Sequence, residues 1–536
     1  MKFIKTKINN KVKKIISIGT IAMVISTITF GSNISLASQG MPSKPGGNMG
    51  GPNNGGNQGS SSISYSGAST ISEDTTNSDE QYESTTGGQN ALLVSSGNST
   101  LTNVNVNKTG DSSDENADFY GTNAGILTYN GATLNINNGT IQTNGSHANG
   151  VFAYGTGTIN ISDTKINTSS NNSGGIMVAG GGTINASNLS VSTSGNSSAA
   201  IRSDRGGGTI VVNGGTYETS GVGSPAVYST ANITVNNSNL SSTASEGIVV
   251  EGANSVTLNN TTLTDNNTTL NGNSETYKNI FLYQSMSGDA SSGNASFNAK
   301  KSTITTNNGD TFFVTNTTAT ITLEDNTIIN NANGAFIRIQ SGKWGNSGSN
   351  GGDVTLNLVN QDANGNIYVD NISTLNMSLT NGSNYEGAIN TENTAKTLNV
   401  TLDSTSTLTL TADSYITSLT DELDDYSNIN LNGYTLYVNG NAITSTNYDS
   451  TIKEKNSNTT SSNTLMEVAQ TNNTSAEDTE ASSNSSNSEK NTLSKTEMIA
   501  IYIIVISIIL LVILIFIKFN KHNKKNINNN NNNYQK

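Results

Sequence analysis

The chain has 536 residues and a net charge of −13, with only 32% hydrophobic and 12% charged residues. Both fractions are well below those of ordinary globular proteins, and Asn, Ser, Thr and 53 Gly fill the difference. The lack of Cys excludes disulfides and thiol chemistry, the 2 His exclude multi-histidine metal sites, and the acidic balance argues against nucleic acid as a partner.

The N-terminus has the three-part layout of a secretory signal peptide. A Lys-rich start precedes the apolar run 15–30, and Ser35 and Ala37 provide the small residues of a cleavage site. We expect residues 1–37 to be removed on export; an uncleaved membrane anchor is the alternative. Residues 40–62 are rich in Gly, Asn and Pro, which predicts a flexible linker.

A repeat of 25 residues organises the body, which we place at residues 63–450. Each repeat holds three short segments in which apolar and polar residues alternate, and alternation of period two predicts strands. Three strands per repeat, each stacked on the next repeat, predict an all-β, right-handed parallel β-helix. A β-sandwich array is the alternative, but it gives no reason for a fixed step. The three apolar columns are Ile126, Val151, Ile176, Ile201, Val227 and Ile248; Leu134, Ile159, Ile184, Ile210, Ile233 and Val256; and Ile141, Ile166, Val191, Tyr217, Leu240 and Leu263.

Two further features belong to the same architecture. Asn135, Asn160 and Asn185 fall at one position in three consecutive repeats, so we expect their side chains to hydrogen-bond along the axis. Solenoids need an atypical last repeat to cover the open core, and we place this cap at about residues 413–440, where two strand-like stretches surround Gly433.

The C-terminus predicts a stalk, a membrane span and a tail. Residues 457–495 are Ser, Thr, Asn and Glu with few apolar residues, which is typical of an extended stalk. Residues 498–517 contain no charge and are long enough to cross a bilayer as one transmembrane helix. Lys-rich residues 518–536 then mark a cytoplasmic tail, so we expect a single-pass protein of the cell membrane with an extracellular body.

The repeats resemble a known group of proteins. The stretch SAAIRSDRGGGTIVVNGGTY and the terminal SYITSL and NINLNGYTLYVNG are similar to bacterial secreted and surface right-handed parallel β-helix proteins. These comprise the pectate-lyase-like superfamily and the adhesin-like, membrane-anchored proteins of Gram-positive bacteria. The resemblance covers about residues 91–440. It implies the fold, and it implies either carbohydrate binding or the cleavage of acidic polysaccharides by carboxylates, an Arg or Lys base and often calcium.

One strip of residues on the first strand of each repeat is the candidate site. Residues next to the inward column point outward, which brings aromatic rings beside charged groups in an Arg-poor chain. Aromatic rings and charged groups together suit sugar rings. The alternative is a solvated surface ion pair of Arg202 with Asp204 and aromatic rings packed on a covering loop. The ligand-binding candidates are Phe152, Tyr154, Arg202, Asp204, Arg205, Tyr228 and Glu251.

Two readings of this strip stay open. In the first, the protein is non-catalytic and binds an extracellular glycan or the surface of a host or neighbouring cell. In the second, it is a polysaccharide lyase or glycoside hydrolase, with Asp204, Glu251 and Arg202 as catalytic residues. Asp204 and Glu251 lie two repeats apart, about 9–10 Å by strand spacing, which approaches the carboxylate separation of inverting glycosidases.

We expect no cofactor, and calcium is the one metal ion for which the sequence offers candidate ligands. Residues 111–119 are an insertion between the first repeats. Its carboxylates either provide oxygen ligands for calcium or belong to a solvated loop. Trp344 lies in a Gly/Ser/Asn-rich loop and serves either as a sugar platform or as a side chain that closes the loop onto the repeat. The calcium candidates are Asp111, Asp114, Glu115 and Asp118.

Overall fold

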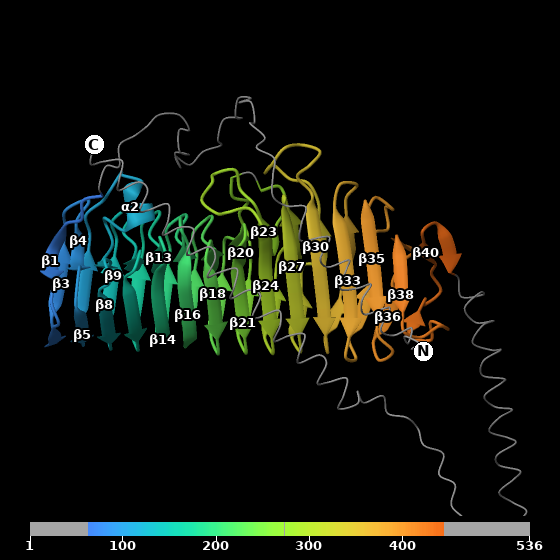
Figure 1. The fold of residues 1–536 in the computed structure, drawn as a ribbon, viewed down its shortest axis with the longest axis horizontal. Coiled ribbons are helices and arrows are strands. Elements are labelled where there is room, and N and C mark those ends of the chain that lie inside the picture. Colours follow the sequence, from blue (N-terminus) through green and yellow to red (C-terminus); the bar gives the residue numbers. More distant parts are fainter. Residues whose placement is uncertain (1–62, 273, 444–536) are drawn as a thin grey trace, which may run out of the picture. The chain divides into compact units, whose positions relative to one another are not determined.

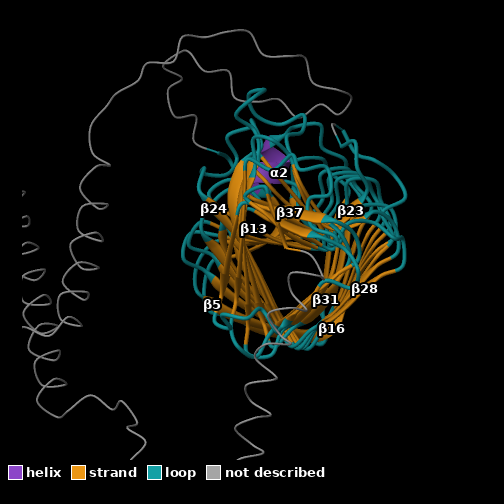
Figure 2. Ribbon diagram, turned by 90° about the vertical axis from the view of Figure 1, so that its right-hand side faces the viewer, coloured by secondary structure: helices purple, strands orange, loops and turns teal. Residues whose placement is uncertain are grey.

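The computed structural model describes residues 63–272 and 274–443. They form a right-handed parallel β-solenoid of about 15 turns, as the 25-residue repeat predicts. The turns stack along one axis (Figure 1), and strands enclose the core on every side in the end view (Figure 2). The expected segments 1–37, 40–62, 457–495, 498–517 and 518–536 lie outside the described residues.

The first strand of each turn contributes to a 12-stranded parallel sheet, called here the first sheet. Its strands in order are β1 (Gly67–Ile71), β4 (Asn90–Val94), β7 (Ile126–Thr128), β10 (Val151–Tyr154), β13 (Ile176–Ala179), β15 (Ile201–Ser203), β17 (Val227–Ser229), β20 (Ile248–Glu251), β23 (Lys278–Tyr283), β26 (Asp310–Thr315), β29 (Ile337–Ile339) and β32 (Ile367–Val369).

The second and third strands of the turns share a 22-stranded sheet. The second strands are β2 (Thr76–Ser78), β5 (Asn98–Thr102), β8 (Thr133–Asn137), β11 (Thr158–Ser162), β14 (Gly182–Thr193), β16 (Gly208–Thr219), β18 (Asn232–Asn236), β21 (Ser255–Asn259), β24 (Asn294–Lys300), β27 (Thr317–Glu324), β30 (Gly352–Val359), β33 (Thr374–Thr380), β35 (Thr397–Leu402) and β38 (Ser418–Asp421). The third strands are β3 (Gln81–Ser84), β6 (Asn105–Lys108), β9 (Thr140–Thr143), β12 (Lys165–Thr168), β19 (Asn239–Ser242), β22 (Thr262–Asp265), β25 (Thr303–Thr306) and β28 (Thr327–Asn330).

Not every turn has the expected three separate strands. In two turns, β14 and β16 run through the second and third positions as single 12-residue strands. Near the C-terminal end the third strands form a separate four-stranded sheet, and a three-stranded sheet ends the solenoid. The four-stranded sheet consists of β31 (Asp362–Asn364), β34 (Asn384–Gly387), β36 (Thr407–Leu410) and β39 (Ile429–Asn430), and the last sheet of β37 (Ser414–Ile416), β40 (Leu436–Val438) and β41 (Asn441–Ile443).

The register confirms all three predicted apolar columns. Ile176, for example, pairs with Val151 on one side and Ile201 on the other, and its side chain is fully buried. The columns form one continuous core along the axis, in which each residue contacts its counterparts above and below. A narrow core of this kind needs few apolar residues per turn, which explains the low hydrophobic fraction.

The Asn ladder is also confirmed. Asn185 donates to Asn160 and Asn160 to Asn135, each at 2.9 Å, and Asn135 continues the ladder to Asn98 at 2.9 Å. Identical amides can bond in this way only because the strands are parallel and in register.

The turn that contains the insertion is longer than the 25-residue step, since Ile126 pairs with Leu92. The two strand-like stretches around Gly433 are confirmed as β39 and β40, which join β36 and β37 rather than each other. The chain instead reverses at Asn439 and Gly440, both with positive φ, as the turn between antiparallel β40 and β41 requires.

The described residues contain little helix. The short helix α2 (Asn116–Tyr120) lies in the insertion and ends at Gly121, whose φ of 72° is left-handed. Among residues 63–272 and 274–443, no helix is long and apolar enough to cross a membrane.

Substitution of a column residue tests the stacking. We expect Ile176→Asp to lower the free energy of unfolding by several kcal/mol, because it buries an unpaired carboxylate between two apolar neighbours. Ser192→Asp in the same turn is the control, since Ser192 is exposed and a surface change costs at most ~0.5 kcal/mol. Urea denaturation followed by circular dichroism measures both, and equal losses would contradict the predicted burial.

Candidate functional site

The outer face of the first sheet carries the strip that the sequence singled out. Phe152, Leu127 and Met177 point away from the main core, as the alternation predicts, and form a second apolar cluster with Leu93. Phe152 is nevertheless fully buried, and Tyr154 is half-buried. The face is therefore covered, which confirms the alternative of aromatic rings packed on a covering loop. The expected solvated surface pair is wrong, because Arg202 and Asp204 are both buried.

Three segments beyond the regular repeat cover the face. The first contains α2, which lies on the outer side of the first sheet in the end view (Figure 2). Tyr120 of α2 contacts Tyr154, with ring centroids 5.5 Å apart. The second segment, 284–293, follows β23, and the third, 340–351, follows β29. These segments pack on the outward side chains and shield them from solvent.

A buried chain of charges lies beneath the first segment. Arg202 is only 5% exposed, and its guanidinium lies between two carboxylates, at 3.2 Å from Asp204 and 3.8 Å from Asp118 of α2. Asp118 also accepts a hydrogen bond from His147 at 2.9 Å. Arg205 pairs with Asp289 of the second segment, and its guanidinium carbon lies 3.5 Å from the centre of the Phe119 ring. The charges thus hold two covering segments to the solenoid.

The electrostatics follow from burial and pairing. Burial raises the pKa of Asp204 to about 6, against the opposing effect of Arg202. The hydrogen bond to Asp118 is the main reason why the pKa of His147 is raised, although burial lowers it. With His147 protonated, two cations balance the carboxylates of Asp118 and Asp204, which is the arrangement that burial demands.

Glu251 has a different environment. It accepts hydrogen bonds from the hydroxyls of Tyr228, of Tyr283 at 3.0 Å, and of Ser285 in the second covering segment. Burial raises the pKa of Glu251, and the three hydroxyls oppose this by stabilising the anion. Burial also raises the pKa of both tyrosines well above the usual value, so they remain donors.

The two carboxylates proposed as catalytic, those of Asp204 and Glu251, are therefore occupied by hydrogen bonds within the fold. Asp204 is 6% exposed and uses its oxygens on Arg202 and on the backbone N–H of Arg205, at 2.8 Å. Glu251 is 1% exposed and uses both oxygens on hydroxyls. A general acid or base needs a path to the substrate. Glu251 instead binds Ser285 of the second covering segment, and Asp204 binds Arg202.

The calcium candidates are dispersed. Asp111 accepts from the backbone N–H of Ser146 at 2.8 Å, Asp114 from that of Asn116 at 3.0 Å, and Asp118 pairs with Arg202 as described. Across residues 63–272 and 274–443, no three acidic or histidine side chains are grouped to hold a metal ion. The arrangement of Asp111, Asp114, Glu115 and Asp118 gives the calcium prediction no support.

Trp344 closes its loop onto the solenoid. Its ring lies 5.2 Å from both Phe281 and Tyr283, in an aromatic cluster with Val249 and Phe313. Of the two roles that the sequence left open, the structure shows the packing role.

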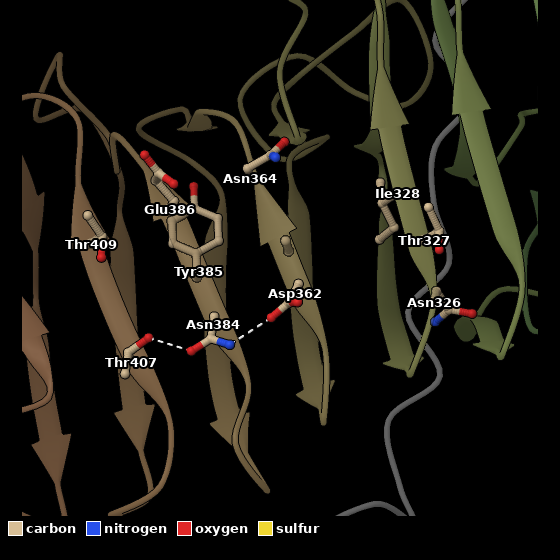
Figure 3. Close-up of a pocket in the computed structure, with 11 residues that line it drawn as sticks. Asn326, Thr327, Ile328, Asp362, Asn364, Asn384, Tyr385, Glu386, Thr407 and Thr409 are labelled. Carbon is tan, nitrogen blue, oxygen red and sulfur yellow. Dashed lines mark hydrogen bonds between the residues drawn. The ribbon is translucent and has the colours of Figure 1, made fainter.

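Sequence reasoning missed a polar cleft at the break between the two third-strand sheets. β28 pairs only with β25, and β31 pairs only with β34, so these successive strands have facing edges without a ladder. The opening, of about 370 Å³, is shown in Figure 3. We call it the seam cleft. Its lining residues are Asn326, Thr327, Ile328, Asp362, Ala363, Asn364, Asn384, Tyr385, Glu386, Thr407 and Thr409.

A side chain replaces the missing ladder at one end of the cleft. The amide of buried Gln361 donates to the carbonyl of Asn326 at 2.8 Å and accepts from its N–H at 2.8 Å, as a backbone peptide would. Beyond Gln361 the strands separate, because the loop that leads to the next strand of the first sheet becomes shorter. This loop has six residues after Asn330, between β28 and β29, but only two after Asn364, between β31 and β32. The shortening of this loop is the sequence signal that would have located the cleft.

Polar side chains line the outer wall of the cleft in a fixed chain. Thr407 donates to Asn384 at 2.6 Å, and Asn384 donates to Asp362 at 2.7 Å (Figure 3). Asn364 and Glu386 are exposed on the same strands. The lining contains two carboxylates and no Lys or Arg, so the cleft favours neutral or cationic hydrogen-bonding ligands over anions.

The buried charge chain generates a pH prediction. Since the pKa of His147 is raised above its ordinary value of 6.5 in the fold, the pair with Asp118 stabilises the protein fully below pH 6.5. This stabilisation is lost as the pH rises through the folded-state pKa. Titration of the imidazole signals by NMR should show a pKa above 6.5 for His147, and Asp118→Asn should lower it. A wild-type value at or below 6.5 would contradict the pairing.

Comparisons with known proteins add no relative to this geometry. No protein-family model, no curated protein and no solved structure matches the chain.

Proposed function

We propose that the protein is a non-catalytic surface protein whose solenoid presents the seam cleft as a glycan-binding site. The observation that carries the proposal is the lining of the cleft: amides and hydroxyls in fixed positions, held by the hydrogen-bonded chain from Asp362 to Thr407. Such groups match the hydroxyls of a sugar, and the volume suits one or two sugar units.

The proposal moves the expected site and changes the ligand. An anionic glycan at Arg202 would have to displace α2 and break the pairs of Arg202 with Asp118 and Asp204. Arg202→Ala would also leave the buried carboxylate of Asp204 without its ion pair, and breaking a buried pair typically costs ~3–5 kcal/mol. Binding by Phe152, Tyr154, Arg205, Tyr228 and Glu251 stays a prediction that requires the covering segments to open.

Display at the cell surface belongs to the same proposal. It rests on the signal-like residues 1–37 and the apolar residues 498–517, together with the resemblance to membrane-anchored adhesin-like and pectate-lyase-like proteins. Protease added to intact cells should then remove the solenoid and leave a small membrane-held fragment. Protection of the solenoid would contradict the extracellular placement.

Paired substitutions test the cleft. Glu386 and Glu83 each occupy the third position of a third strand with the same burial pattern, but only Glu386 lines the cleft. We expect Glu386→Ala and Asn384→Ala to weaken binding to a neutral or amino-sugar glycan by about 5- to 10-fold each, which corresponds to the ~1 kcal/mol of one hydrogen bond. Glu83→Ala is the control and should bind as the wild type does. A glycan array identifies the probe, and calorimetry measures the affinities.

The outcomes separate the competing functions. Selective binding of anionic glycans, or equal binding by all three variants, would move the site away from the cleft. The lyase or hydrolase alternative predicts release of unsaturated or reducing-end sugars from pectin, alginate or glycosaminoglycans. Sustained release by the wild type, abolished by Asp204→Asn or Glu251→Gln, would overturn the non-catalytic proposal.

A further inference from the structure

A buried lysine near the middle of the solenoid has two acids around it. Glu246 and Lys278 each lie two residues before Ile248 and Ile280, which pair in adjacent turns. The Nζ of Lys278 is 3.1 Å from Oε1 of Glu246, and the two side chains are only 2% and 8% exposed. Nζ also lies 4.5 Å and 5.4 Å from the ring centres of Phe281 and Phe313. Nζ also donates to Oγ of Ser274 at 2.7 Å and to the carbonyl of Thr276 at 3.1 Å, so the amine and the carboxylate meet in a buried environment with few polar partners.

Asp265 completes the cluster. Its neighbour Asn267 connects it to the lysine, because the Asn267 N–H donates to Asp265 at 3.3 Å and its side chain donates to the carbonyl of Lys278 at 3.1 Å. The side chain of Asp265 is fully buried, and its Oδ1 has no hydrogen-bond partner. Burial raises the pKa of Asp265 to about 9, and the charge of Glu246 adds to the rise while that of Lys278 opposes it.

The position of Asp265 in its column explains why the neutral acid fits there. In three consecutive earlier turns, this place holds a threonine whose hydroxyl donates to the carbonyl of the following corner, as Thr143 does to Ala148 at 2.6 Å. Its register partners on either side, Ser242 and Thr306, are hydroxyl residues too. A carboxyl can take over the role of a hydroxyl donor only in its protonated form. The fold therefore places a buried acid in the same cluster as the amine and the carboxylate, near enough for the charges of both to act on it.

We propose that Lys278 and Glu246 form an intramolecular isopeptide bond, with Asp265 as the group that transfers the proton. Nζ of Lys278 gives one proton to a carboxylate oxygen of Glu246 and then attacks its Cδ, and a C–N bond forms. The Asp265 carboxyl protonates the departing hydroxyl, the C–O bond breaks, and one water leaves. Asp265 regains its proton from the former ammonium. The balance is one ammonium and one carboxylate converted to one amide and one water, with no other reactant.

The chain contains its own control for burial. Lys300 and Glu324 also lie in adjacent turns, with Nζ and Oε1 2.7 Å apart, but their side chains are 50% and 39% exposed. Water solvates this pair, so proximity alone leaves it without a bond. The proposal therefore predicts an amide at the buried pair and none at the exposed one.

Mass spectrometry of the trypsin-digested, denatured full chain tests the proposal. Between Arg205 and Lys300 the only tryptic site is Lys278, and trypsin does not cleave after a lysine whose amine is an amide. We expect a peptide 206–300 that is lighter by one water molecule, with fragments that place the link between Glu246 and Lys278. Cleavage after Lys278 with no loss of mass would overturn the proposal.

Two variants separate the chemistry from the packing. Lys278→Arg keeps a cation beside Glu246 and removes the amine, so it should show the full mass. Asp265→Thr restores the residue type that other turns use in this column, so the turn should fold while the bond forms at least tenfold more slowly. Unchanged circular dichroism in both variants confirms folding. A bond that forms equally fast in Asp265→Thr would overturn the role of Asp265.

Discussion

Parallel, in-register stacking is the constraint on which the rest of the structure depends. Each inward residue contacts the equivalent residue of the turns above and below, and backbone hydrogen bonds fix the spacing between turns. The same spacing lets Asn160 bridge two neighbouring amides, and it brings Glu246 and Lys278 close enough to pair. Because every turn is supported only by its neighbours, the chain gains stability by repetition and needs no wide apolar interior.

Departures from the 25-residue step carry the distinctive features of the molecule. Additional residues become segments that cover the first sheet, and these segments bring Asp118 to Arg202 and Ser285 to Glu251. A shortened corner after Asn364 separates β31 from β28 and opens the seam cleft. The regular turns thus supply rigidity, while the irregular ones supply charges, cavities and candidate chemistry.

The repeat made the fold predictable, and the irregular turns limited what could be said about the site. Three apolar columns and the Asn ladder follow directly from residue spacing, because period-two alternation and a fixed step leave one parallel arrangement. The outward direction of Phe152 and Arg202 was predictable for the same reason. Their burial was not, since alternation gives the side of the sheet and says nothing about which distant segment packs there. Gln361 was missed because a side-chain amide that replaces a backbone ladder leaves no periodic signal.

Distances between spin labels test the stacking most directly, and the Cys-free chain offers a clean background for labelling. Thr140, Asn239, Thr262 and Thr327 lie in one column of the third strands, with Thr140 as the common reference. Pulsed electron–electron resonance from Thr140 to the other three, which lie four, five and seven turns away, should give distances that grow by ~4.8 Å per turn, reaching ~34 Å at Thr327. Distances that grow by ~10 Å or more per repeat, or that show no order, would contradict the stacked solenoid.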